Sequence, residues 1–257
     1  MREIPAEWSE RIPRYPTKAR RERIFNETLH PVLIDAGFKP AKIGYWRLID
    51  EQILQMIYCD VAAKYHYMSV GGYVPLAGVC VRLMSLNTEP CLRSFENTDV
   101  FVQRQQEFTG FLFPGMEKDF TPSFLHTYCD DFQFAMECET ELLVEQTLPK
   151  LDTICTNASL AEYLYQRVVP KRSYGGLYAA FLRFAAWPLM CENRWDDLER
   201  LLNRQLQYIP DQLWLWEDIL KLVQEKDAHT VEALAKKHYE QNMAYLLTLS
   251  AEHSEQL

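Results

Sequence analysis

The stretch LIDAGFKPAKIGYWRLIDEQILQMIYCD, residues 33–60, decides the fold that the sequence predicts. It joins the end of a helix, marked by Gly37-Phe38, to the first of several short apolar runs that are rich in aromatic residues and continue to Val81. Polar or turn residues separate these runs, so we expect strands at 43–49, 53–61 and 66–74. The connections are short, and neighbouring strands should therefore pair antiparallel as a meander.

A helix leads into this sheet. Thr17 can cap its first turn, and Gly37 can end it as the residue after the C-cap. The apolar residues between them fall roughly on one helical face: Ile24, Leu29, Val32, Leu33 and Ala36. Pro31 lies inside this helix and should kink it or divide it near His30. Residues 1–18 carry prolines among charges and are predicted to form an irregular N-terminal arm.

A second helix is expected to pack on the sheet and close the domain. Residues 79–115 contain further strand-like pieces and predict at least one more strand. Residues 130–147 then show helical periodicity, with an apolar face opposite an acidic one. Leu148-Pro149 should interrupt this helix before a short continuation.

Strand patterns end at Asn157. Five segments of helical length follow, at 158–168, 175–190, 195–207, 212–224 and 228–248. The sequence therefore predicts an α+β fold in two parts, an α+β domain over 19–156 and an all-helical C-terminal bundle over 157–257.

Composition narrows the class of protein. The chain has 257 residues, of which 48% are hydrophobic, so it can bury a substantial core. It contains no apolar run long enough to cross a bilayer, and its N-terminus lacks the apolar segment of a signal peptide. Seven cysteines without CxxC spacing are typical of reduced, buried thiols. We expect a cytoplasmic protein with no membrane partner.

The net charge of −9 is unevenly distributed. Residues 24–154 carry 18 Asp and Glu against nine Lys and Arg, whereas residues 1–23 carry four against seven. An acidic domain of this kind repels phosphate backbones and attracts basic proteins. The charge therefore predicts a protein partner, which would be basic, and no nucleic-acid partner.

Several segments together resemble an uncharacterised bacterial family, domain of unknown function 4304. The resemblance covers about residues 20–165 and lies in Leu33–Phe38, Tyr45-Trp46-Arg47, Gln52–Tyr58, Met68–Pro75, Thr147–Leu151 and Ser159–Tyr163. It implies a leading helix ending in Gly-Phe, an antiparallel meander and a closing helix, and it implies no activity. A second strand with a Gln-x-Ser motif, which is typical of that family, is not found here, and the helical extension is additional. Some members of the family resemble immunity or anti-phage proteins.

Acidic residues near the closing helix are the candidate protein-binding site. Glu137, Glu141 and Glu145 repeat every four residues and would form one row along a helix, which Asp130 and Asp131 precede. The row is a solvated face, a docking surface for a basic partner or, if one carboxylate is desolvated, a pair for general acid/base catalysis. On this basis the sequence favours a non-catalytic protein-binding module, such as an immunity or antitoxin factor for a basic effector.

Two alternatives remain open. An enzyme or small-ligand-binding protein would have its site on the sheet face, near Trp46, Gly71, Gly72 and Tyr73, or between the two parts. A scaffold would instead bind a peptide in an exposed groove lined by Trp187, Trp195 and Trp214. The sequence contains no local catalytic motif, and we expect no catalytic residue, no cofactor and no metal.

Overall fold

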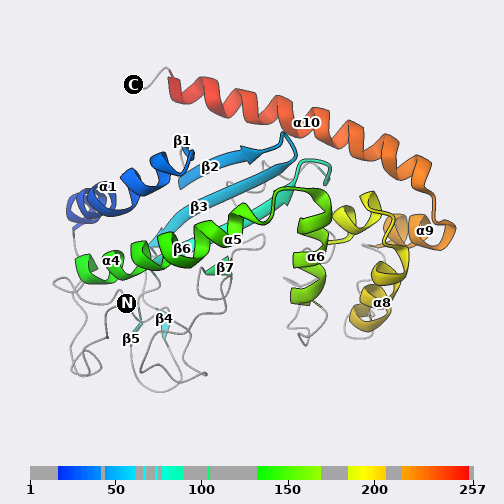
Figure 1. Ribbon diagram of the computed structural model, residues 1–257, viewed down its shortest axis with the longest axis horizontal. Coiled ribbons are helices and arrows are strands. Elements are labelled where there is room, and N and C mark those ends of the chain that lie inside the picture. Colours follow the sequence, from blue (N-terminus) through cyan, green and yellow to red (C-terminus); the bar gives the residue numbers. More distant parts are fainter. Residues whose placement is uncertain are drawn as a thin grey trace.

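The computed structural model describes residues 17–41, 44–61, 66–67, 73–74, 77–89, 103–104, 132–168, 185–206 and 216–254. Figure 1 shows a twisted sheet with helices on both of its faces and a group of helices at one end. The fold is α+β with a helical C-terminal part, as the sequence predicts. The predicted N-terminal arm falls almost entirely outside the described residues.

The main sheet is antiparallel throughout and has five strands in the order β1-β2-β3-β6-β7. They are β1 (Lys39–Ala41), β2 (Gly44–Ile49), β3 (Ile53–Val61), β6 (Ala77–Ser85) and β7 (Gln103–Arg104). The predicted strands at 43–49 and 53–61 are confirmed as β2 and β3, and β6 confirms a further strand within 79–115. Side chains alternate across the sheet, so that Ile53, Gln55 and Ile57 face one way and Leu54 and Met56 the other.

The predicted strand at 66–74 is wrong. Its described residues form two short strands, β4 (His66–Tyr67) and β5 (Tyr73–Val74), which pair with each other antiparallel in a separate sheet. The chain therefore reverses direction between them, and β6 takes the place beside β3. A short apolar run can be read as one strand or as two halves of a hairpin, because both have the same periodicity.

Helix α1 (Lys18–Asp35) begins and ends where its capping residues predict. The hydroxyl of Thr17 accepts a hydrogen bond from the backbone N–H of Arg20. At the other end, Gly37 has a φ of 80°, its N–H donates to Ile34, and the N–H of Phe38 donates to Leu33, which is a Schellman motif.

Pro31 does not divide α1, contrary to one of the two expected outcomes. Proline removes a single N–H bond and crowds the preceding turn. Leu29 and Leu33, which flank it in the sequence, are fully buried in the core. Packing on both sides of Pro31 therefore holds the helix together where the backbone alone would favour a break.

The closing helix continues through Pro149 by means of a wider turn. Helix α4 (Phe132–Leu142) passes into the π-helical segment η3 (Leu143–Thr147) and then into α5 (Leu148–Asp152). The N–H of Leu148 donates to the carbonyl of Leu143, five residues back. A π turn relieves the clash between a proline ring and the carbonyl four residues earlier, so the interruption predicted at Leu148-Pro149 is a local widening.

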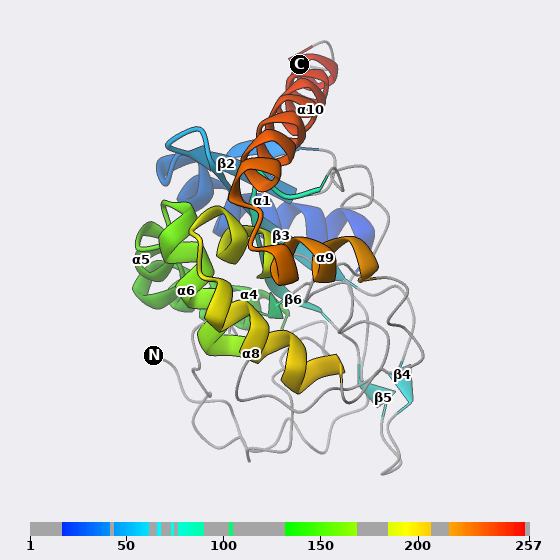
Figure 2. The same ribbon diagram turned by 90° about the vertical axis from the view of Figure 1, so that its right-hand side faces the viewer.

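The described C-terminal residues are helical, as predicted. They form α6 (Asn157–Val168), a helix over 185–191, α8 (Trp195–Leu206), α9 (Glu217–Glu225) and α10 (Ala228–Ser254). Trp216 is the N-cap of α9, so this helix begins after the predicted residue 212. Figures 1 and 2 show α6, α8 and α9 grouped at one end of the sheet.

Two apolar clusters lie on opposite faces of the sheet. The larger one joins α1, α4 and α5 to the sheet and extends into α6, α8 and α9. The smaller one lies under α10 and contains Trp46, Leu54, Met84, Leu86 and Leu246. The last helix thus covers the second face of the sheet, along which it runs in Figure 1.

Candidate functional site

A cavity of about 660 Å³ lies between the sheet and the C-terminal helices. One side is formed by Asn87 after β6, Asn157 at the start of α6, and Met190, Cys191 and Asn193. The other side is one face of α10, including His229, Glu232, Lys236 and Tyr239. All of its lining residues except Asn87 belong to the predicted C-terminal part, so the cavity lies within that part, where it meets the turn after β6.

Hydrogen bonds fix the amide groups at one end of this cavity. The buried hydroxyl of Ser85 donates to Oδ1 of Asn157 at 2.5 Å, and Nδ2 of Asn157 donates to Oδ1 of Asn87 at 3.2 Å. The backbone N–H of Asn87 donates back to the Ser85 hydroxyl at 3.1 Å. The two asparagines are thereby held in defined orientations, as recognition of a polar ligand requires.

Helix α10 is fastened to the turn after β6 by side-chain bonds to backbone carbonyls. Nδ2 of the buried Asn242 donates to the carbonyls of Leu86 and Thr88 at 2.8 and 2.9 Å. Nδ1 of His238 donates to the carbonyl of Asn87 at 3.3 Å. Since Asn87 also lines the cavity, the turn and α10 are held together at the place where the cavity forms.

His238 lies beside the cavity in a mostly apolar environment. Its ring meets that of Trp187 edge to face, with centroids 4.6 Å apart. The indole N–H of Trp187 donates to Glu89 at 3.2 Å. Burial lowers the pKa of His238, against the opposing effects of the Asn87 carbonyl and the Glu89 carboxylate. The imidazole is therefore neutral at pH 7.

The first turn of α10 is fixed by Asp227. Its carboxylate accepts hydrogen bonds from the backbone N–H of Thr230 at 3.0 Å and from the Thr230 hydroxyl. These bonds lower the pKa of Asp227. The cap sets where α10 begins, and thereby which of its residues face the cavity.

Cys191 lines the cavity, and it is protonated. Burial, and secondarily the nearby Glu192 carboxylate, raise the pKa of its thiol to about 12. The nucleophilic form of cysteine is the thiolate. At neutral pH this side chain therefore contributes a small apolar surface to the cavity.

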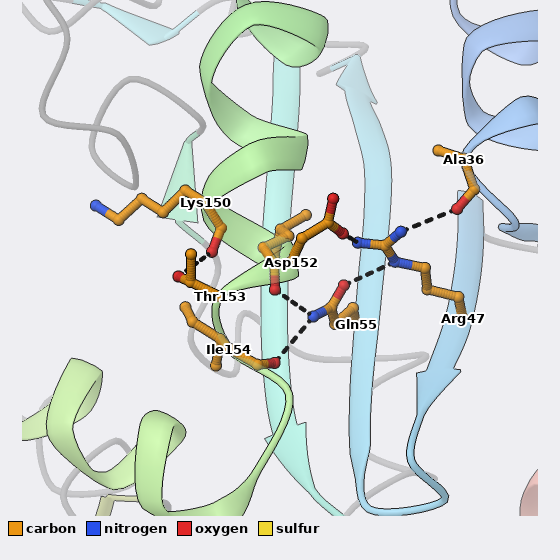
Figure 3. A network of polar contacts seen from close by, with 8 residues as sticks. Ala36, Arg47, Gln55, Lys150, Asp152, Thr153 and Ile154 are labelled. Carbon is orange, nitrogen blue, oxygen red and sulfur yellow. Dashed lines mark hydrogen bonds and ion pairs between the residues drawn. The ribbon is translucent and has the colours of Figure 1, made fainter.

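A second polar network lies within the α+β part, between the sheet and α5 (Figure 3). Buried Gln55 donates through Nε2 to the carbonyls of Leu151 and Ile154 at 2.8 and 3.1 Å. Its Oε1 accepts from Nε of Arg47, whose guanidinium also donates to the carbonyl of Ala36. The network ties the ends of α1 and α5 to β2 and β3, and all of its buried groups are satisfied by the protein itself.

Arg47 is held from two further directions. Its guanidinium donates to the exposed carboxylate of Asp152 and lies 4.6 Å from the ring centroid of Phe38. Phe38 and Arg47 are among the residues that carry the family resemblance. The structure gives both a role in packing the end of α1 against the sheet.

The residues predicted for a site on the sheet face are not brought together in the described structure. Trp46 is 8% exposed and lies beneath α10, with Nζ of Lys39 5.4 Å from its ring centroid. Tyr73 lies in β5 of the separate hairpin. Gly71 and Gly72 fall outside the described residues.

The predicted acidic row is only partly exposed. Glu137 and Glu141 on α4 are half-buried, and Glu137 accepts a hydrogen bond from Gln133 at 3.2 Å. Glu145 is exposed on η3, beside Val144, which is 48% exposed. Asp130 and Asp131 fall outside the described residues.

The tryptophans predicted to line an exposed groove are buried where the structure describes them. Trp187 and Trp195 are 2% and 9% exposed and belong to the larger apolar cluster. Trp214 falls outside the described residues. These indoles help to hold the C-terminal helices on the sheet.

Sequence reasoning missed the residues that line the cavity. They come from segments that are distant along the chain, around 87, 157, 190 and 232. No local spacing connects them. The only sequence signal is on α10, where positions 229, 232, 236 and 239 share one helical face.

Comparison of the chain with protein-family models, curated proteins and solved structures found no match. The family resemblance of the leading segments thus stays a prediction. In the described part of the chain, no helix combines the length and apolar character needed to cross a membrane. Within the same ranges, no three His, Cys, Asp or Glu side chains are grouped as metal ligands would be.

Proposed function

We propose that this chain is a non-catalytic cytoplasmic protein that binds a small polar molecule in the cavity between the sheet and α10. The observation that carries the proposal is the cavity itself, whose volume of about 660 Å³ lies within the range of about 300–1,000 Å³ for small-molecule sites. Its walls combine apolar side chains with a few polar ones, as such sites do.

The thiol state of Cys191 favours binding over chemistry at the cavity. Cys191 is a thiol at neutral pH, so it does not offer a thiolate nucleophile. His238 is neutral and donates through Nδ1 to a backbone carbonyl, which ties its ring to the fold. Both groups therefore support the structure of the site.

The test is native mass spectrometry of protein purified gently from its own host, for the parent chain and two variants. Ala228→Trp places an indole in the cavity from an exposed position on α10. Ala233→Trp is the matched control, because Ala233 is exposed on the same helix and does not line the cavity. We expect a small molecule to be retained by the parent and the control and lost from Ala228→Trp. Equal retention by both variants, or no retained molecule in any, would contradict the proposal.

A second candidate function is binding of a basic protein by the acidic domain, as an immunity or antitoxin factor neutralises an effector. The observation that favours it is the excess of nine acidic residues over bases in 24–154, together with exposed Glu145 beside exposed Val144. Protein interfaces surround an apolar core with a polar rim, in which an exposed carboxylate can lie. The family resemblance, which remains a proposal, also supports it.

Charge reversal tests this second candidate. With a basic partner captured from the host, Glu145→Lys should slow association at low salt, because exposed charges steer the encounter. Glu240→Lys on α10 is the control, since that residue is also exposed and lies far from the row in sequence. Association at the parent rate for Glu145→Lys at low ionic strength would rule out this surface.

A further inference from the structure

Two opposite charges on α10 line the cavity without pairing with each other. Glu232 and Lys236 are four residues apart, in the order that favours an ion pair along a helix. Both are exposed side chains. Within the described part of the chain, neither makes a hydrogen bond or an ion pair. Both charged groups are thus available to a molecule in the cavity.

The charges of the lining cancel. Glu232 is its only acid and Lys236 its only permanent base among the described residues, and His229 is the remaining titratable nitrogen. A strongly anionic or cationic ligand would find one partner and one repelling group. A molecule that carries one charge of each sign would find a partner for both.

The rest of the lining fits the remainder of such a molecule. Met190, Val231 and Ala235 provide apolar surface. The amides of Asn87 and Asn157 are held by each other and by the Ser85 hydroxyl, and Nδ2 of Asn87 also donates to the carbonyl of Ala235 on α10 at 3.4 Å. In such a molecule the ammonium can contact Glu232 and the carboxylate can contact Lys236. Its short apolar chain can pack on the apolar lining residues.

We propose that the cavity binds a small zwitterion with an apolar side chain, of the class of an α-amino acid, with Glu232 contacting its ammonium and Lys236 its carboxylate. This inference rests on the proposed function, since it assigns a ligand class to the same cavity. In this assignment the charged residues of α10 recognise the ligand, and Asn87 and Asn157 help to form the wall of the cavity.

The test is isothermal titration with three probes that share the same isobutyl group. L-leucine carries both charges, 3-methylbutan-1-amine only the ammonium, and 4-methylpentanoate only the carboxylate. We expect measurable affinity for leucine and at least about tenfold weaker binding of the other two, which corresponds to the loss of one charged contact. In Lys236→Gln, leucine should bind no more tightly than 3-methylbutan-1-amine. In Glu232→Gln, leucine should bind no more tightly than 4-methylpentanoate.

Lys237→Gln is the matched control, because Lys237 is exposed beside Lys236 and does not line the cavity. It should bind leucine as the parent does. Equal binding of all three probes, or equal effects of Lys236→Gln and Lys237→Gln, would overturn the assignment of a zwitterion. No binding of any probe would also overturn it. The proposed function would still stand in either case if the parent retained a small molecule that Ala228→Trp lost.

Discussion

Gln55 and Leu151 lie 96 residues apart in the sequence, and the side-chain amide of the first donates to the backbone carbonyl of the second at 2.8 Å. Gln55 is fully buried in the middle of β3, where an apolar residue would be expected from the pattern of the strand. Its amide gives a partner to the carbonyl of Ile154 and a further donor to the carbonyl of Leu151, which also accepts from the backbone N–H of Ile154. The closing helices thereby gain a fixed position on the sheet.

Replacing this glutamine by a side chain of similar shape should therefore be costly. Gln55→Met leaves the carbonyl of Ile154 and Nε of Arg47 without this partner and removes one donor from the carbonyl of Leu151, and we expect a loss of about 2–4 kcal/mol in the free energy of unfolding. Urea denaturation measures it. Gln52→Met, at an exposed position, should change stability by no more than about 0.5 kcal/mol. Similar values for the two variants would show that the network contributes little.

Two glycines with positive φ should differ in their tolerance of alanine. At Gly44, with a φ of 88°, an added Cβ would lie 2.4 Å from the carbonyl oxygen of Ile57 and 2.5 Å from Cβ of Tyr58. At Gly37, with a φ of 80°, it would meet nothing within 4 Å. We expect Gly37→Ala to cost about 1–2 kcal/mol from the left-handed backbone alone, and Gly44→Ala clearly more. Thermal or urea unfolding measures the loss of stability in each variant. Equal losses for the two would contradict this expectation and show that β3 can move away from β2 to make room for the added Cβ.

The stability of the fold should decrease in mild acid because of His238. Burial lowers its pKa in the folded protein, so the unfolded chain takes up a proton first, near the ordinary value of about 6.5. The contribution of neutral His238 is therefore complete above that pH and is lost as the pH falls through the lowered pKa. Gln at this position can still donate to the Asn87 carbonyl, and His238→Gln should make stability less dependent on pH between about 7 and 5. Parallel pH profiles for parent and variant would contradict this.

Cys191 should be protected from alkylation in the folded protein. With its pKa raised to about 12, the thiolate fraction at pH 8 is about a thousandfold lower than in an unfolded chain. We expect iodoacetamide to modify Cys191 at least about a hundredfold more slowly in buffer than in urea. Peptide mass spectrometry separates this cysteine from the others, including Cys155, which is also free. Similar rates in buffer and in urea would show that the thiol is accessible and more acidic.

The parts of the fold that depend on local chemistry could be predicted. Thr17 and Gly37 set the ends of α1 through bonds to neighbouring backbone groups, and the alternating side chains of β2 and β3 identify them as strands. The continuity of α1 through Pro31 could not be predicted, because it depends on the burial of Leu29 and Leu33 in the core. The position of α10 over the sheet also depends on contacts between distant segments, such as that of Asn242 with Leu86.

The candidate site was predictable only in part. A cavity between the two parts of the chain was an open alternative, whereas the cavity lies within the C-terminal part and meets the first part only at Asn87. Its residues were not predictable, because Asn87, Asn157 and Lys236 become neighbours only when α6 and α10 reach their places. The acidic row, by contrast, follows from helical spacing, and the structure leaves Glu145 exposed and Glu137 and Glu141 half-buried.

The position of α10 has a consequence for synthesis in the cell. Trp46, Leu54 and Met84 are translated early, whereas Leu246, which packs with them, leaves the ribosome more than 150 residues later than Met84. Until then this apolar face of the nascent sheet lacks the cover of α10, and an exposed apolar sheet face is prone to aggregation. A ribosome that stalls before α10 is complete would therefore release a chain that depends on chaperones, however well its first half has folded.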